Sequence, residues 1–104
     1  MEITYKTTKL KKVFEGRKKL IKDFGPRQAY KITQRMNELH AAVSLHDIKC
    51  NPSAGLHALS GKYKDYLAID LNHPYRLIIE PEDGDREDYR TITIVKIIKV
   101  EDYH

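Results

Sequence analysis

Three separated stretches of the 104-residue chain carry side chains that could share acid–base chemistry. His57 lies just before a run of apolar and β-branched residues, Arg76 lies at the beginning of the next such run, and the chain ends in Asp102-Tyr103-His104. Histidine changes its protonation near neutral pH, whereas arginine offers a permanently charged fork that matches phosphate oxygens. These residue types suit the cleavage of a phosphodiester.

Cleavage of RNA by transphosphorylation needs no nucleophile from the protein, because the substrate's own 2′-hydroxyl attacks the phosphorus. A base takes the proton of that hydroxyl, an acid protonates the leaving 5′-oxygen, and a cation offsets the charge that grows on the phosphate. A tyrosine can stack on an unpaired base. Each residue also has an ordinary explanation, since loop histidines are usually solvated, strand arginines usually pair with carboxylates and chain ends usually fray. The hypothesis depends on the three stretches meeting in the fold.

Metal and cysteine chemistry find little support in the sequence. His40, His46 and Cys50 lie close together, but their spacing matches no structural zinc pattern. The single cysteine excludes an internal disulfide and suits a reducing compartment. Gly61 and Gly84 stand alone, so no phosphate-cradling glycine loop is indicated. We therefore expect no metal and no other cofactor.

The first half of the chain has the periodicity of amphipathic helices. Apolar residues share one helical face over residues 9–24 and again over residues 27–43. Gly25-Pro26 predicts the end of one helix and the beginning of the next, and one further turn is expected over Ser44–Ile48. The apolar positions are Leu10, Val13, Phe14, Leu20, Ile21, Phe24, Ala29, Ile32, Met36, Leu39 and Val43.

The second half has the pattern of β-strands joined by turns. A turn is expected at residues 72–74 and an acidic hairpin tip at residues 82–88. The elements predict a single α+β domain over residues 1–104, with two N-terminal helices packed on one face of a three- to four-stranded antiparallel sheet. Strands are expected over residues 66–71, 75–80 and 91–100, with a short edge strand over residues 2–6.

This topology can bring the separated stretches together. In an antiparallel meander the beginning of the middle strand lies beside the end of the last strand, so Arg76 is expected close to residues 102–104. His57 can reach the same region if the loop before the first long strand is directed there. One pocket would then hold an imidazole, a guanidinium and a carboxylate.

Basic residues are concentrated in the N-terminal half. The formal net charge is +4; residues 1–50 hold 12 Lys or Arg and 5 Asp or Glu, while residues 51–104 hold 7 and 10. A basic surface attracts polyanions such as RNA, although lysines also serve solubility alone. No apolar run is long enough to span a bilayer, so a soluble cytoplasmic protein that does not act on a membrane is expected.

Four segments of the chain, in this order, resemble the HigB branch of the RelE/ParE toxin superfamily, the toxins of type II toxin–antitoxin operons: Leu56–Gly61, Tyr66–Ile69, Tyr75–Ile78 and Asp102–His104. The resemblance covers nearly the whole chain and implies a RelE-like fold. It implies a ribosome-dependent mRNA endonuclease (an mRNA interferase) that works without a cofactor. The implied partners are the 70S ribosome with its mRNA and an inhibiting helix-turn-helix antitoxin of the HigA kind.

Matching positions carry the implied roles. His57, Asp102 and His104 are the acid and base candidates, with base and acid unassigned. Arg76 would hold the scissile phosphate, and Tyr103 would orient or stack a base. The other residues that the resemblance assigns to the site are basic residues that bind RNA.

The resemblance also implies contacts between basic residues and RNA. Relatives often carry a lysine where this chain has Ser60, and Lys62 or Lys64 can take over its phosphate contact. Pro74, just before the Tyr-Arg pair, can shift the position of Arg76. A solvated helix face is the ordinary alternative for the helical cations. Those expected to bind ribosomal RNA are Lys11, Lys12, Lys18, Lys19 and Lys22, with Arg27, Lys31 and Arg35.

Two other functions stay open. A toxin of the ParE kind, which poisons DNA gyrase, would share the fold, but such toxins generally lack the terminal Asp-Tyr-His set. A non-catalytic RNA- or protein-binding module is the second alternative. It predicts that the His57→Ala and His104→Ala variants behave like the parent.

Overall fold

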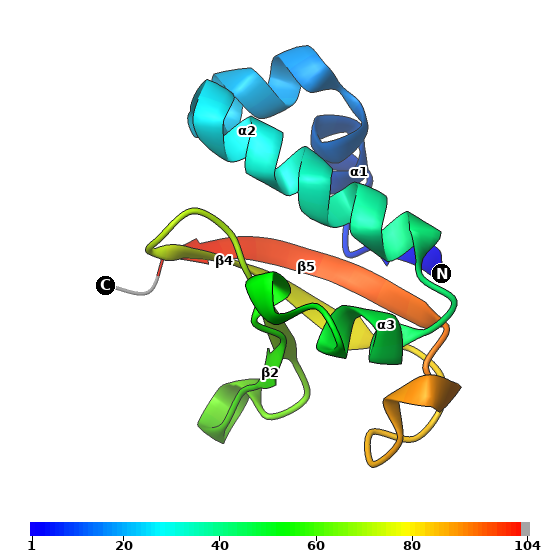
Figure 1. The fold of residues 1–104 in the computed structure, drawn as a ribbon. Coiled ribbons are helices and arrows are strands. Elements are labelled where there is room, and N and C mark those ends of the chain that lie inside the picture. The colour runs from blue at the N-terminus through cyan, green and yellow to red at the C-terminus, as the bar shows by residue number, and fades with distance from the viewer. Residues whose placement is uncertain (103–104) are drawn as a thin grey trace.

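The structure, a computed structural model, describes residues 1–102 and consists of helices packed against one five-stranded sheet (Figure 1). The strand order in the sheet is β1-β5-β4-β3-β2. None of the described helices is long and apolar enough to cross a membrane. The helices are α1 (Thr8–Glu15), α2 (Arg17–Ala41) and α3 (Leu45–Lys49), and the strands are β1 (Glu2–Tyr5), β2 (His57–Ala58), β3 (Leu67–Asp70), β4 (Tyr75–Pro81) and β5 (Ile94–Asp102).

The α+β class and the packing of helices on one face of a sheet are confirmed, but the sheet is larger than predicted and mixed. The short β2 adds a strand beyond β3. The edge strand β1 pairs in parallel with β5, with Glu2 opposite Ile94. No hairpin sets the direction of β1, because all other elements lie between it and β5 in the chain. The predicted all-antiparallel arrangement holds only for β2 to β5.

The helix predicted over residues 9–24 is divided at Gly16, where the backbone is extended. The side chain of Thr7 caps α1 by accepting a hydrogen bond from Leu10 N at 3.1 Å. The break folds the apolar face of α1 against the beginning of α2, and the rings of Phe14 and Phe24 pack edge to face at 6.4 Å between centroids. Burial of these faces against each other explains why one amphipathic pattern gives two segments.

The predicted junction at Gly25-Pro26 is a kink inside α2. Gly25 has φ +81° and ψ 161°, a conformation that side-chain-bearing residues rarely adopt. The helix ends at Ala41, earlier than predicted, so the predicted place of Val43 on its apolar face is wrong, and Val43 is 82% exposed. The chain becomes extended at Ala42, and Leu45 of α3 enters the core instead.

The two faces of the sheet differ. The face under the helices carries the main core, whereas the opposite face carries a small apolar cluster of Ala68, Ile78 and Ile98 with Leu59 and Tyr66. We call this side of the sheet, opposite the helices, the open face. Outside the small apolar cluster it carries polar side chains. The largest fully buried side chains of the protein are Ile32, Leu39, Leu45, Ile69, Leu77, Ile78, Ile79, Ile92, Val95 and Ile97.

Candidate functional site

The strand register places the beginning of β4 beside the end of β5, as the meander argument predicted. Arg76 is opposite Glu101, and Tyr75 is opposite Asp102. Because side chains alternate between the two faces of a strand, Glu101 shares the face of Arg76, whereas Asp102 falls on the face of Tyr75. Asp102 therefore lies close to Arg76 in the strand register, but its side chain leaves the backbone on the opposite face of the sheet. Tyr103 and His104 lie outside the described residues.

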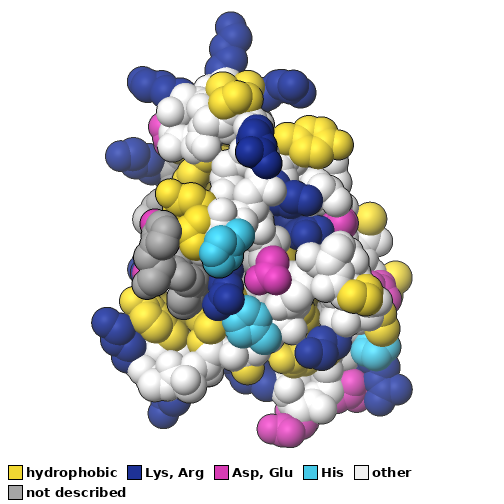
Figure 2. All heavy atoms as spheres, turned by 60° about the vertical axis from the view of Figure 1, so that its left-hand side comes forward, with side chains coloured by type: hydrophobic (Ala, Val, Ile, Leu, Met, Phe, Trp, Pro, Cys, Tyr) yellow, Lys and Arg dark blue, Asp and Glu magenta, His cyan; other side chains and the backbone are white. Residues whose placement is uncertain are grey.

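His57, Asp70 and Arg76 form a contacting group on the open face, which we call the histidine–arginine cluster. Arg76 Nη1 lies 3.4 Å from His57 Nε2, and Arg76 Nε lies 3.5 Å from Asp70 Oδ1. Figure 2, which shows the side of the molecule where β5 ends, has histidine, basic and acidic side chains gathered at its centre. Two of the five residues proposed from the sequence, His57 and Arg76, are therefore brought together.

The backbone before β2 sets the tautomer of His57. His57 Nδ1 lies 2.8 Å from the carbonyl oxygen of Gly55, and a carbonyl can only accept, so Nδ1 carries the hydrogen. In the neutral ring Nε2 is then the acceptor, and the guanidinium of Arg76 donates to it. The ring thus presents its proton-accepting atom to the arginine that is the phosphate-binding candidate.

Gly55 is required by this geometry. Asn51 accepts hydrogen bonds from the backbone and hydroxyl of Ser53, and the short turn that follows ends at Gly55 with φ +57°. A Cβ at this position would lie 2.7 Å from Asp70 Cγ and closer still to Oδ2. Residue 55 therefore needs both a left-handed backbone and the absence of a side chain.

Arg35 supports the cluster from behind, and its predicted contact with RNA is wrong. Its side chain is 4% exposed and donates to the carbonyl oxygens of Asp70 at 2.8 Å and Ser53 at 2.7 Å, while Glu38 pairs with it at 2.9 Å. The signal was present in the sequence, since Arg35 lies three residues after Ile32 on the apolar stripe. A cation at such a position can be buried when its donors are paired, as those of Arg35 are.

The open face carries a second cation that the sequence analysis missed. The ladder shifts between Ile78 and Ile79 of β4, so that β5 has an extra residue and Lys99 lies opposite Ile78. Simple alternation along residues 95–99 would have sent Lys99 to the helical face. Its ammonium hydrogen-bonds Glu101 at 2.5 Å, and this bond raises the pKa of Lys99. Lys99 therefore stays charged, and it forms an ion pair with Glu101, the residue opposite Arg76 in the register.

The other predicted RNA-binding residues lie outside the cluster, and all are exposed except Lys31, which is half-buried and donates to Gln34 Oε1 at 3.2 Å. Lys62 and Lys64 are in the loop between β2 and β3, which borders the open face, and Lys62 lies 5.2 Å from the centroid of Tyr63. The helical lysines surround α1 and the beginning of α2, and Figure 2 shows basic side chains projecting from this upper part of the molecule. They are Lys11, Lys12, Lys18, Lys19 and Lys22.

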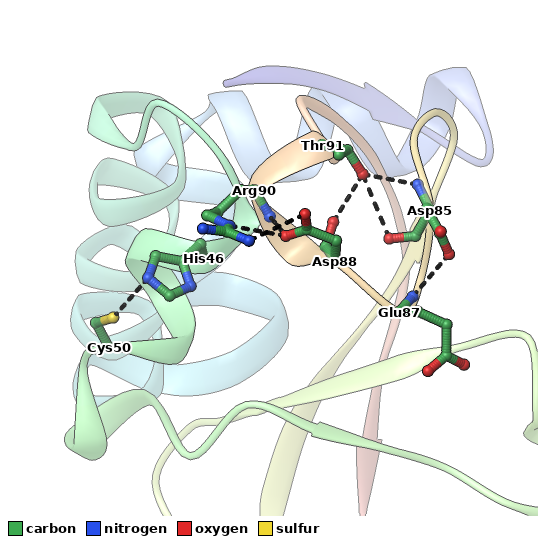
Figure 3. Close-up of polar contacts among 7 residues, drawn as sticks. All are labelled: His46, Cys50, Asp85, Glu87, Asp88, Arg90 and Thr91. Atoms are coloured by element: carbon green, nitrogen blue, oxygen red, sulfur yellow. Dashed lines mark hydrogen bonds and ion pairs between the residues drawn. The ribbon is translucent and has the colours of Figure 1, made fainter.

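The acidic tip lies at the end of β5 opposite to the cluster (Figure 1). Its carboxylates are used locally: Asp88 pairs with Arg90 at 2.9 Å, and Asp85 Oδ1 accepts from Glu87 N at 2.9 Å (Figure 3). In the same view His46 contacts Cys50, with Nε2 3.3 Å from Sγ. Within residues 1–102, no three His, Cys, Asp or Glu side chains group as a metal site.

Most of the chain matches a known protein family. Residues 3–91 match the family model of the HigB-like toxin, described as the RelE-like toxin of type II toxin–antitoxin system HigB. No curated protein matches the chain. The matched part contains His57, Asp70 and Arg76, but it ends before β5, so Asp102, Tyr103 and His104 lie outside it.

Proposed function

The chain belongs to the HigB-like family of RelE-like toxins of type II toxin–antitoxin systems, and from this premise we propose that it is an endoribonuclease that cleaves mRNA on the ribosome without a metal. As a type II toxin it has a protein antitoxin as its partner. The proposed antitoxin is an inhibiting helix-turn-helix protein of the HigA kind. A toxin that acts on translating ribosomes works in the cytoplasm.

One observation supports the proposal most: the 3.4 Å contact between His57 Nε2 and Arg76 Nη1 on the open face. A phosphate bound by Arg76 would lie within reach of the His57 ring, whose unprotonated nitrogen Nε2 can accept a proton. When the phosphate oxygens take the donors of Arg76, Nε2 is released to the neighbouring 2′-hydroxyl. The contact thus joins a proton acceptor and a phosphate-binding cation, two of the three groups that the chemistry requires.

In the proposed reaction the 2′-oxygen of the substrate forms a bond to phosphorus while the bond from phosphorus to the 5′-oxygen breaks. The products are a 2′,3′-cyclic phosphate and a free 5′-hydroxyl. His57 Nε2 takes the proton of the 2′-hydroxyl, and Arg76 offsets the charge on the phosphate. Asp102 or His104 returns a proton to the 5′-oxygen, and Tyr103 stacks a base; these last roles rest on the resemblance alone.

Basic residues around the cluster would bind the RNA backbone. Lys62, Lys64 and Lys99 border the open face and would contact the message. The lysines of α1 and the beginning of α2 would contact ribosomal RNA phosphates, where each neutralised charge releases a counterion. The acidic tip lies at the far end of β5 and would stay clear of the RNA.

A purified translation system tests the proposal. Sequencing of 5′ ends on a translated message, with and without the protein, should show new cuts that need ribosomes and that disappear with His57→Ala. EDTA added to the protein before its dilution into the reaction should not reduce them. A message that stays intact would overturn the proposal. Inhibited DNA supercoiling by gyrase would then indicate the ParE kind of toxin, and RNA binding without cleavage would indicate a non-catalytic module.

A further inference from the structure

Asp70 stands beside the proposed phosphate-binding arginine, where a negative charge repels a phosphate. It occupies the end of β3, opposite Arg76 in the strand register and on the same open face. A carboxylate there weakens the attraction of the site for RNA, so charge attraction gives no reason for its presence. A geometric role accounts for it better.

Two contacts of Arg76 engage different nitrogens of its guanidinium. Asp70 Oδ1 faces Nε at 3.5 Å, and His57 Nε2 faces Nη1 at 3.4 Å. The guanidinium is planar and rigid, so fixing Nε restricts the direction of every other donor. The ion pair with Asp70 thus restrains one edge of the plane, while Nη1 lies against His57.

The backbone of Asp70 is held in place by a buried arginine. Its backbone carbonyl oxygen accepts from Arg35 Nε at 2.8 Å, and the Nη2 of the same guanidinium donates to the backbone carbonyl oxygen of Ser53 at 2.7 Å. Gly55, two residues after Ser53, lies directly against the Asp70 carboxylate and also holds the ring of His57. One buried arginine therefore fixes the supports of both His57 and Arg76.

We infer that Asp70 is a positioning residue, which holds the guanidinium of Arg76 in the orientation that RNA cleavage needs. The inference rests on the proposed nuclease function. It makes an unusual prediction about the Asp70→Asn variant, in which the charge is removed and the shape is kept. If Asp70 acted only through its charge, the variant would bind RNA more tightly and cleave it as fast as the parent or faster. If Asp70 positions Arg76, the variant should have a lower kcat with KM unchanged or reduced.

The test measures mRNA cleavage on ribosomes by Asp70→Asn in two backgrounds. In the parent background kcat should fall about 10- to 100-fold, the size of effect that misplacement of a reacting group produces. In an Arg76→Lys background, where the Nε–H donor is absent, the same change should have little further effect. Asp65→Asn, which removes another exposed acid near the open face, should cleave like the parent.

Two results would overturn the inference. Asp70→Asn could cleave as fast as the parent, or it could lose the same factor in both backgrounds, which would show that Asp70 acts independently of Arg76. A second measurement separates this inference from the nuclease proposal. In NMR spectra of the full chain, solvent exchange of the Arg76 Nε–H should accelerate several-fold in Asp70→Asn and not in Asp65→Asn. If the parent protein does not cleave mRNA, the nuclease proposal is overturned. If the exchange of the Arg76 Nε–H is the same in the parent and in Asp70→Asn, the positioning role of Asp70 is overturned.

Discussion

At residue 55 the fold combines a backbone requirement with a packing requirement. Gly55 has φ +57°, and its missing side chain leaves room for the carboxylate of Asp70. Replacement by alanine costs about 1–2 kcal/mol for the left-handed backbone alone. The new methyl group must also displace Asp70, and with it the support of Arg76.

We therefore expect Gly55→Ala to lose both stability and cleavage. Urea unfolding should show a free energy of unfolding lower by about 1–2 kcal/mol or more, and the rate of mRNA cleavage should fall at temperatures where the variant is folded. Gly25→Ala is the control, since Gly25 also has a positive φ but a methyl group added there would meet no packed side chain or other part of the fold within 4 Å. It should lose stability and keep the cleavage rate; equal cleavage by both folded variants would contradict this account.

Residue type and position identified His57 and Arg76 from the sequence, but not their supports. Asp70 and Gly55 are 15 positions apart, and only the pairing of β2, β3 and β4 makes them neighbours. No local pattern reports such a contact. Arg35 is different, because its place on the apolar stripe of α2 already indicated burial. It was assigned to RNA binding only because it belongs to the basic residues of the N-terminal half.

At the scale of elements, the acidic tip is held to β5 by Asp83. Its carboxylate accepts hydrogen bonds from the hydroxyl of Thr93 at 2.5 Å and from the backbone N–H groups of Thr93 and Ile94 at 2.8 and 3.0 Å. These bonds, led by the Thr93 hydroxyl, lower the pKa of Asp83. The ionised form therefore favours the folded state, and protonation removes this contribution.

A pH dependence of stability follows from that direction. The contribution of Asp83 is complete above the pKa of an unfolded aspartate, about 3.9, and is lost as the pH falls through the lower folded value. Asp83→Asn should be less stable than the parent at pH 7, and the gap should shrink below about pH 4. Thermal unfolding from pH 7 to pH 2 measures both curves. A gap that stays constant with pH would show that the carboxylate charge plays no part.

Elements differ in how far their sequence patterns reveal them. Helical periodicity predicted that most of the segment from Thr8 to Ala41 is helical, the Gly25-Pro26 pair predicted the kink in α2, and the strand-like pattern located β3 and β4. Periodicity did not show the break at Gly16, because α1 and α2 share one apolar face after folding back. It also did not show the shift in the ladder of β4 and β5, which reverses the faces of Lys99 and Glu101. Non-local packing decides both features.

Over the whole molecule, the helical lysines, the histidine–arginine cluster and the acidic tip occupy three separate regions. The helical lysines lie around α1 and the start of α2, the histidine–arginine cluster lies on the open face, and the acidic tip lies at the far end of β5 (Figures 1 and 2). This arrangement suits a protein that is held by one RNA surface while it acts on another. Binding to ribosomes should then depend on salt through the helical lysines.

The double variant Lys18→Gln/Lys22→Gln tests this charge distribution. Ribosome affinity should fall, and the slope of log affinity against log salt should decrease by about one for each lysine that contacts a phosphate. Arg90→Gln/Lys96→Gln removes the same charge near the acidic tip and should leave the slope unchanged. Equal slopes for both double variants would assign the helical lysines to solubility. Sedimentation with ribosomes at several salt concentrations gives the slopes.

The most direct test of the account is the single-turnover rate of mRNA cleavage on ribosomes by Arg76→Ala, compared with the parent and with Arg90→Ala. If Arg76 offsets charge on the reacting phosphate, its removal should slow cleavage by about 10²- to 10³-fold, as for loss of an oxyanion donor. Arg90→Ala, at the far end of the sheet, should match the parent. Cleavage by Arg76→Ala at the parent's rate would contradict a phosphodiester site at the histidine–arginine cluster.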